Sequence, residues 1–159
     1  IAWQEAAEHL GEGDLIQVWD PRLAAAPVLA ATERGAQVIL SPASRVYLDM
    51  KYSEDSKRGL VWIGHTELAD TAAFVPDEAI EGLDPRHIAG VEAALWTETL
   101  ETFEHLSYML LPRLAAVGEI GQRGRVDWLD FIERLPATAR FWQERGWPYH
   151  RSPGVEWPS

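Results

Sequence analysis

The chain has 159 residues, of which 47% are hydrophobic and 25% are charged, a composition typical of one globular domain with a single core. Its formal net charge of -11 disfavours nucleic acid and anionic membranes as partners, because a phosphate surface demands clustered Lys and Arg. It contains no cysteine, which excludes a disulfide framework and a thiolate metal site, and no apolar run approaches the roughly 20 residues of a membrane helix.

The first part of the chain predicts parallel strands with a helix between them. Residues 1–3 are expected to form the tip of a strand, followed by one or two helical turns over 5–10. Short apolar runs at 15–20 and 37–42, each closed by polar or breaker residues, have the length of buried strands. Because a short helix over 28–34 separates these two runs, we expect a right-handed parallel crossover.

Charge, proline and glycine content then rise and the periodicity fades. We interpret residues 51–87 as one long irregular rim loop, the kind of connection that carries functional residues on a barrel. Tyr47 and Asp49 precede it, alternating with apolar neighbours, and Trp62 lies within it. A rim tyrosine beside a solvated aspartate is the alternative interpretation of Tyr47 and Asp49.

A further apolar run, at 90–98, ends in a tryptophan and a carboxylate. We interpret it as a barrel strand that carries Trp96 and Glu98 at its far end, two residues apart and therefore on one face. A carboxylate accepts hydrogen bonds from sugar hydroxyls and an indole covers the apolar face of a pyranose, so the pair predicts a sugar site. A buried core tryptophan followed by a helix-capping glutamate is the alternative.

The remainder of the chain predicts helices. Apolar residues recur at helical spacing over 103–110 and again over 114–120, with a proline between the two segments. Asp127 is placed to cap a last helix over 128–145, whose aromatic residues form a core-facing stripe. Residues 146–159 are turn-like and aromatic, and we expect them to pack as an irregular tail.

Several of these motifs occur together, in the same order, in a known family. They are Gln-Val-Trp at 17–19, Ser-Pro-Ala at 41–43, Tyr-Leu-Asp-Met-Lys-Tyr at 47–52, Gly-Leu-Val-Trp at 59–62, Val-Glu-Ala-Ala-Leu-Trp-Thr-Glu-Thr at 91–99 and Met-Leu-Leu-Pro-Arg-Leu-Ala at 109–115. With them the sequence resembles, from Trp3 to its end, the C-terminal part of a glycoside hydrolase family 20 beta-N-acetylhexosaminidase.

The resemblance implies a pocket for an acetamide group. In that family the acetamide oxygen of the substrate attacks the anomeric carbon, so no enzyme nucleophile is required. By resemblance, Trp3, Trp19 and Trp96 wall the acetamide pocket, and Tyr47 donates its hydroxyl to the acetamide carbonyl. For Trp3 the alternative is a terminal hydrophobic residue packed on the next helix.

The resemblance also implies contacts to the rest of the sugar. Asp49 and Glu98 would accept hydrogen bonds from its outer hydroxyls, and Trp62 would close over it from the loop. The implied ligands are glycans that end in an N-acetylhexosamine, and no cofactor and no metal are implied.

The family's catalytic pair, an aspartate beside a general-acid glutamate, is not expected in this chain. Asp77–Glu78 follows a proline and precedes apolar residues, as acidic residues that open a helix do, whereas the family's pair follows a buried strand upstream. His65 and His87 lack metal-ligand spacing and are interpreted as solvated loop residues. Without general-acid assistance, of about 10² to 10⁴ in rate, the isolated chain is expected to be inactive.

The predicted fold class is α/β: the C-terminal half of a TIM (β/α)8-type barrel with long rim loops and C-terminal helices, as a single domain over 1–159. A full barrel needs about 250 residues, so the chain has room for about the last four strand-helix units and is expected to be cut from a longer protein. Half a barrel leaves open edges and an exposed apolar interior. We therefore predict a homo-oligomer that buries the edges at 16–18 and 91–95.

The parent protein is thus expected to be an exo-acting enzyme that hydrolyses terminal N-acetylglucosamine or N-acetylgalactosamine with retention. A non-catalytic carbohydrate-binding module that uses the same tryptophans is the alternative, and an inactive folding unit is the third interpretation. The sequence indicates no cellular compartment.

Overall fold

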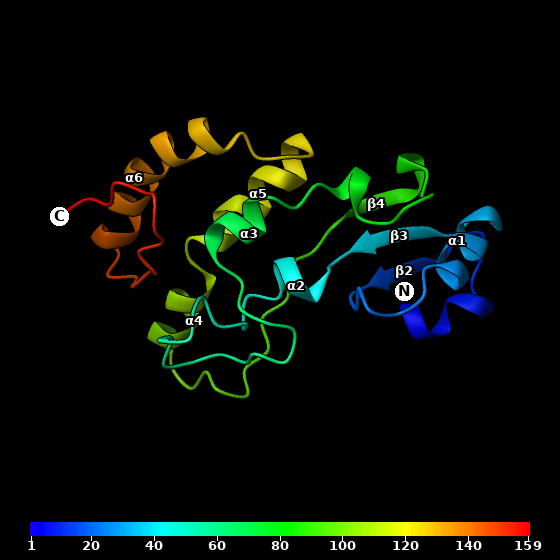
Figure 1. Ribbon diagram of the computed structural model, residues 1–159, viewed down its shortest axis with the longest axis horizontal. Helices are drawn as coiled ribbons and strands as arrows, with labels where there is room; N and C mark the ends of the chain where they lie inside the picture. The colour runs from blue at the N-terminus through cyan, green and yellow to red at the C-terminus, as the bar shows by residue number, and fades with distance from the viewer.

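The computed structural model describes residues 1–159 and contains one parallel sheet (Figure 1). Its strands, in spatial order, are β1 (Ala2–Trp3), β2 (Leu15–Val18), β3 (Gln37–Leu40) and β4 (Ile88–Val91). Every neighbouring pair is parallel, which confirms the predicted α/β class. Strands β2 and β3 begin at the predicted residues, and β1 begins one residue later than predicted.

Helices connect the strands and continue the chain after the last one. The two long helices at the C-terminal end follow the predicted periodicity closely, and the Asp127 carboxylate caps the second of them by accepting from the Asp130 N–H. In chain order the helices are η1 (Gln4–His9, a 3-10 helix), α1 (Ala26–Glu33), α2 (Ala43–Val46), α3 (Leu68–Ala72), the 3-10 helices η2 (Pro76–Glu78) and η3 (Pro85–His87), α4 (Phe103–Leu110), α5 (Arg113–Arg123) and α6 (Trp128–Glu144).

One face of the sheet is covered by helices. Ile16, Val38 and Leu40 are buried on this face, since alternate residues of a strand point to the same side. They pack in one core cluster with Val28 of α1 and Ile120 of α5. Burial of this apolar surface holds the strands in register and fixes where their carboxyl ends lie.

The opposite face is polar at its centre. Gln17 of β2 is buried, and its side-chain amide donates to the Ser41 hydroxyl at 3.2 Å and to the Glu92 carboxylate. Hydrogen-bonded polar side chains therefore occupy part of the interior that the sequence predicted to be apolar, beside the partly buried Ile39.

The edges of the sheet also differ from the prediction. Residues 16–18 belong to β2, which pairs with β1 on one side and β3 on the other and is not an edge. The two-residue strand β1 and strand β4 are the edges instead. The homo-oligomer remains a prediction, and of its two predicted edges only the one that begins at Val91 lies on an edge strand.

The strand predicted over 90–98 was wrong in its length. Strand β4 ends at Val91 because its partner β3 ends at Leu40, where the chain turns into α2. Beyond this point the segment changes partner: the Ala94 N–H donates to the Val46 carbonyl, and the Ala94 carbonyl accepts from Leu48. Trp96 and Glu98 therefore lie on an irregular segment.

The segment 51–87 contains three short helices, α3, η2 and η3, as well as irregular backbone. Helix α3 begins with a capping box, in which the Glu67 carboxylate accepts from the backbone of α3 and Asp70 accepts from the Glu67 N–H. Asp77 and Glu78 form most of the 3-10 turn η2, as expected for acidic residues that open a helix. Helices of three to five residues leave no apolar period to detect in the sequence.

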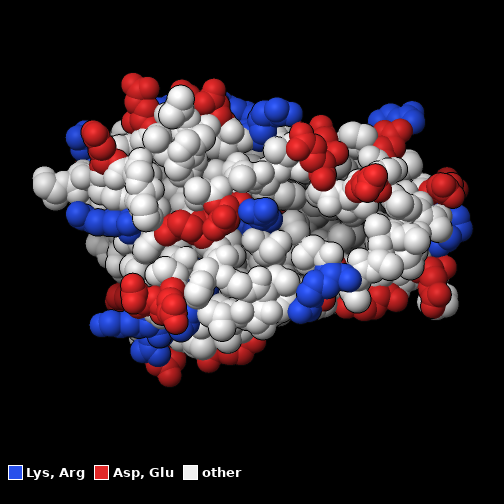
Figure 2. All heavy atoms as spheres, viewed as in Figure 1, with Lys and Arg blue, Asp and Glu red and all other residues white.

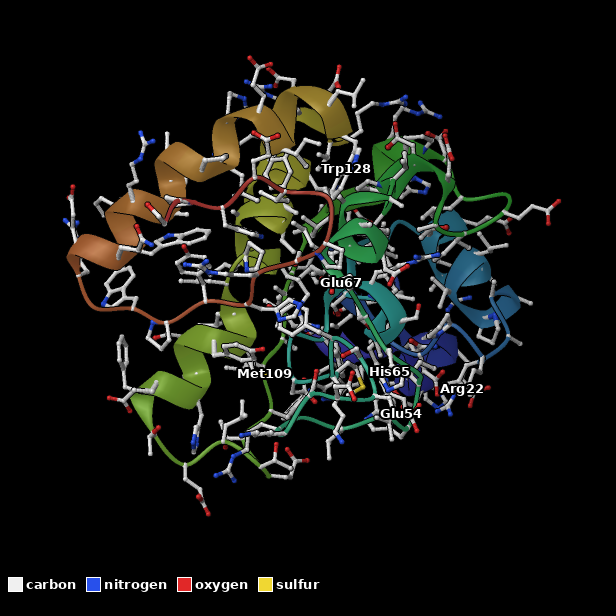
Figure 3. The ribbon with its side chains drawn as sticks, turned by 60° about the vertical axis from the view of Figure 1, so that its left-hand side comes forward. Arg22, Glu54, His65, Glu67, Met109 and Trp128 are labelled. Carbon is white, nitrogen blue, oxygen red and sulfur yellow. The ribbon has the colours of Figure 1, made fainter.

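A second core cluster lies between α5, α6 and the C-terminal tail, at the far end of the molecule from the sheet (Figure 1). Phe131, Leu135 and Trp142 of α6 are buried there. The irregular tail packs across them, and Glu67 lies between α3 and this tail (Figure 3).

None of the helices has both the length and the apolar composition required to cross a bilayer. Acidic and basic side chains are interspersed over the surface seen in Figure 2.

Candidate functional site

A cavity of about 720 Å³ opens at the carboxyl ends of the strands. It brings together every residue that the sequence analysis assigned to the site, although they come from five separate segments. These residues are Trp3, Trp19, Tyr47, Asp49, Trp62, Trp96 and Glu98.

The parallel sheet explains why these segments converge. Trp3 is the last residue of β1, and Trp19 directly follows β2. Tyr47 follows β3 after the single turn of α2, and Trp96 follows β4. The carboxyl ends of parallel strands lie at the same end of the sheet, so a side chain placed just after each strand reaches a common space.

Five aromatic rings, those of Trp3, Trp19, Tyr47, Trp62 and Trp96, form what we call the aromatic cage. The Tyr47 ring centroid lies 6.2 Å from that of Trp19, 6.2 Å from Trp62 and 6.1 Å from Trp96. Trp3 contacts both Trp19 and Trp96, each at 6.4 Å. Such pairs stabilise each other by about 0.5–1.5 kcal/mol beyond the area they bury.

The three outer tryptophans of the aromatic cage remain open to solvent. Trp3 is 43% exposed, Trp62 41% and Trp96 44%. The alternative that Trp96 is a buried core residue is therefore wrong. Large aromatic faces left open around a cavity are available to stack on a ligand with apolar faces.

Tyr47 lies at the base of the aromatic cage. Its side chain is buried among the tryptophans and is only 3% exposed. Burial raises the pKa of the Tyr47 hydroxyl to about 12, with the nearby Asp49 and Glu92 carboxylates acting in the same direction. The hydroxyl therefore keeps its proton at neutral pH and can donate a hydrogen bond into the cavity.

Asp49 is a buried carboxylate without hydrogen-bond partners. It is 1% exposed, and neither of its carboxylate oxygens completes a hydrogen bond within the protein, although the backbone N–H of Trp96 is near enough to act on its pKa. Burial raises the pKa of Asp49 above its ordinary value. The alternative of a solvated aspartate is therefore wrong. Two acceptor oxygens without partners in the wall of a cavity are placed to receive donors from a ligand.

Sequence analysis missed several residues that line the cavity, namely Ala2, Glu5, Ala6 and Leu60. Glu5 is the only charged member of this group, and its carboxylate accepts a hydrogen bond from the Trp19 indole N–H at 3.1 Å. A glutamate on a short helical turn looks like a solvated surface residue in a sequence. Its position two residues after Trp3, in a segment that leaves a strand end, was the available signal.

The polar residues set aside by the sequence analysis lie away from the cavity. Asp77, Glu78 and His65 are exposed, and His87 is half-buried. None of these four residues lines the cavity. No group of three or more His, Asp or Glu side chains is arranged to hold a metal ion.

The parallel sheet and the cavity at its carboxyl ends define part of a TIM-type α/β barrel whose rim loops carry the site. The family model described as glycosyl hydrolase family 20, catalytic domain, matches residues 1–123, and the chain belongs to this family.

Known relatives agree in sequence and in structure. A beta-N-acetylhexosaminidase of Cellulomonas fimi is 45% identical over 99% of this chain and 32% of its own length. The family 20 beta-N-acetylhexosaminidase of Streptomyces coelicolor A3(2) superimposes with a TM-score of 0.91 at 39% identity, covering 98% of this chain and 33% of its own. A mutant Streptomyces plicatus beta-hexosaminidase, solved in complex with its product GlcNAc, gives the same values. The chain thus spans about a third of the length of these relatives.

Proposed function

We propose that the protein to which this chain belongs is an exo-acting beta-N-acetylhexosaminidase, and that this chain supplies its acetamide pocket and its contacts to the sugar hydroxyls. The observation that carries the proposal is the convergence of an aromatic cage, a protonated Tyr47 and an unpaired Asp49 in one cavity. The substrates would be glycans that end in N-acetylglucosamine or N-acetylgalactosamine. The names of the relatives support this substrate class.

The aromatic cage suits an acetamide group that must be held under a sugar ring. Trp3, Trp19 and Trp96 would enclose its methyl group, and the Tyr47 hydroxyl would donate to its carbonyl oxygen. This donation orients the oxygen toward the anomeric carbon and stabilises the positive oxazolinium-like intermediate that forms when the oxygen attacks. Holding the two atoms together in this way contributes about 7–11 kcal/mol in an ideal intramolecular reaction.

The carboxylates would bind the opposite side of the sugar. Asp49 and Glu98 both line the cavity and would accept hydrogen bonds from outer hydroxyl groups. Because Asp49 has no partner in the protein, a sugar hydroxyl would satisfy an acceptor that is otherwise buried and unpaired. Trp62 would cover the sugar from its loop.

Protonation of the leaving oxygen requires an acid, which we assign to a part of the protein outside this chain. The carboxylates of the cavity are Glu5, Asp49 and Glu98, and no two of them are adjacent in sequence. Glu5 already accepts from Trp19, and Asp49 is buried at the cavity wall. We therefore infer that this chain alone binds the sugar without hydrolysing it.

Titration of the intrinsic tryptophan fluorescence with a thiazoline analogue of N-acetylglucosamine tests the pocket, because this analogue mimics the cyclised intermediate. Saturable quenching is expected for the chain, with affinity reduced at least ten-fold by Trp96→Ala and by Tyr47→Phe. Trp128→Phe, which alters a tryptophan of α6 away from the cavity, is the matched control and should leave the affinity unchanged. Absence of binding at millimolar analogue would contradict the assignment.

Hydrolysis of a chromogenic N-acetyl-β-glucosaminide by the full-length protein separates the enzyme from a carbohydrate-binding module. Turnover with retention of configuration is expected. Binding of the analogue by a full-length protein that never turns over would favour the module instead.

A further inference from the structure

Every polar group of Trp19 has a partner in the protein. Its backbone N–H donates to the Gln4 side-chain oxygen at 2.6 Å, and its carbonyl accepts from the Ala43 N–H at 2.8 Å. Its indole N–H donates to the Glu5 carboxylate at 3.1 Å. Two consecutive residues, Gln4 and Glu5, therefore hold the backbone and the ring of one tryptophan.

The two residues act on different parts of Trp19. Gln4 is buried, and its side chain continues the β1–β2 ladder beyond Trp3 by accepting from the N–H groups of Trp19 and Asp20 and donating to the Asp20 carbonyl. Glu5 is exposed and makes no other side-chain hydrogen bond. Gln4 thus fixes the backbone, whereas Glu5 contacts only the far edge of the indole.

The orientation of the Trp19 ring determines the shape of the aromatic cage. Trp19 contacts Trp3 at 6.4 Å, Tyr47 at 6.2 Å and Trp62 at 6.0 Å between ring centroids. With Tyr47 the two ring planes differ by only 12°, so a rotation of the indole about its side-chain bonds would separate a stacked pair. The backbone contacts leave this rotation free, and the hydrogen bond to Glu5 is the polar contact that restricts it.

We propose that Glu5 is a positioning residue of the site: its carboxylate fixes the rotation of the Trp19 indole and thereby the wall against which the acetamide group packs. A charge-assisted hydrogen bond is about twice as strong as a neutral one, which suits an acceptor that must hold a large ring at the edge of an open cavity. The consequence for ligand binding rests on the proposed function, whereas the orientation of Trp19 does not.

The orientation is tested by NMR of the indole N–H groups in the chain, with the Trp19 signal assigned by its loss in Trp19→Phe. Glu5→Leu removes the acceptor, and Glu5→Gln keeps a side-chain oxygen at the same position. We expect hydrogen exchange of the Trp19 indole N–H to accelerate about ten-fold in Glu5→Leu and to stay within about three-fold of wild type in Glu5→Gln. Glu8→Leu alters an exposed glutamate of the same helix η1 whose side chain pairs only with His9, and this control should change nothing.

The consequence for the site is tested by titrating the same variants with the thiazoline analogue. Glu5→Leu should weaken binding about ten-fold, with rescue by Glu5→Gln. Unchanged exchange in Glu5→Leu, or exchange in Glu5→Gln as fast as in Glu5→Leu, would overturn the proposal. If the exchange rates behave as expected while wild type binds no analogue, then Glu5 positions Trp19 and the proposed function has failed instead.

Discussion

The guanidinium of Arg113 lies 3.8 Å from the centre of the Tyr52 ring, and both residues are fully enclosed by the protein. From this position Arg113 donates to the Leu48 carbonyl at 2.7 Å and to the Met50 carbonyl at 2.8 Å. These two carbonyls flank Asp49. The first residue of α5 therefore anchors the backbone on both sides of the carboxylate that faces the cavity.

Arg113→Met should destabilise the chain strongly. The buried guanidinium also donates to the carbonyls of Thr66 and Met109. Its removal leaves the carbonyls of Leu48, Met50 and Thr66 without a donor, whereas that of Met109 still accepts from the Tyr52 hydroxyl. We expect a loss of about 3–5 kcal/mol in the free energy of unfolding, measured by urea denaturation. Arg123→Met on the same helix is the control: its side chain is 61% exposed and pairs at the surface, so its loss should change stability by less than about 1 kcal/mol. Equal losses in the two variants would contradict this role for Arg113.

Gly59→Ala should disturb the loop that carries Trp62. Gly59 has φ +102°, and a β-carbon there would lie 2.6 Å from the Asp49 carbonyl oxygen, closer than any real contact. Gly64→Ala is a matched control, since its φ is +106° but a β-carbon would meet nothing within 4 Å. In both variants the strained backbone should lower the free energy of unfolding by about 1–2 kcal/mol. Gly59→Ala should lower it further, because of the added steric clash, and should also weaken binding of the analogue. Equal melting temperatures for the two variants would show that the loop adjusts freely.

The seven site residues could be predicted from the motifs that carry the family resemblance, and the parallel strands explain why most of these motifs converge at one end of the sheet. The end of β4 could not be predicted, since the apolar run continues to Leu95. What changes after Val91 is the segment with which the chain forms backbone hydrogen bonds. Arg113 gave no signal and Glu5 gave only its position close to Trp3, for the same reason. A charged residue reveals its role only through the partner that the fold places beside it. The partner of Glu5 lies 14 residues away in the sequence, and those of Arg113 lie up to 65 residues away.

Glu67 should make the attachment of the C-terminal tail depend on pH. Its carboxylate accepts from the Ser152 hydroxyl at 2.6 Å, contacts the His150 ring nitrogen at 2.9 Å and accepts from the Leu68 N–H at 2.6 Å. Burial alone would raise the pKa of Glu67, but the hydrogen bonds from His150, Ser152 and Leu68 outweigh it and lower the pKa below 4.5. A carboxyl group whose pKa is lower in the folded state stabilises the fold above its unfolded pKa, and this stability is lost as the pH falls through the folded value.

The free energy of unfolding of Glu67→Gln is therefore expected to be about 1 kcal/mol lower than that of wild type at pH 7. This difference should decline as the pH falls through the lowered pKa of Glu67. Melting temperatures of both proteins between pH 7 and pH 3 measure this. Glu8→Gln, at the exposed pair between Glu8 and His9, should match wild type throughout. A Glu67→Gln difference that stays constant with pH would show that the ionised carboxylate contributes nothing to the attachment.

Asp49→Asn should stabilise the chain while weakening ligand binding. Both oxygens of Asp49 are buried without partners, so the ionised group destabilises the folded state in the absence of a ligand. Burial raises the pKa of Asp49, which means that folding favours its protonated form. The destabilisation is therefore largest above the folded pKa and declines as the pH falls through it. We expect the free energy of unfolding of Asp49→Asn to exceed that of wild type by about 1 kcal/mol at pH 7. This difference in stability should become smaller at acidic pH.

The same substitution should reduce affinity for the thiazoline analogue at least ten-fold, since an amide supplies one acceptor oxygen where the carboxylate supplies two with full negative charge. Urea denaturation at two pH values and fluorescence titration measure the two effects on one preparation. Asp55→Asn, an exposed aspartate of the following loop, should change neither. Gain of stability together with loss of binding would identify a carboxylate that destabilises the fold and is retained because it binds the ligand. Loss of stability in Asp49→Asn would instead mean that the carboxylate supports the fold, and the assignment of Asp49 to the sugar hydroxyls would lose its main physical argument.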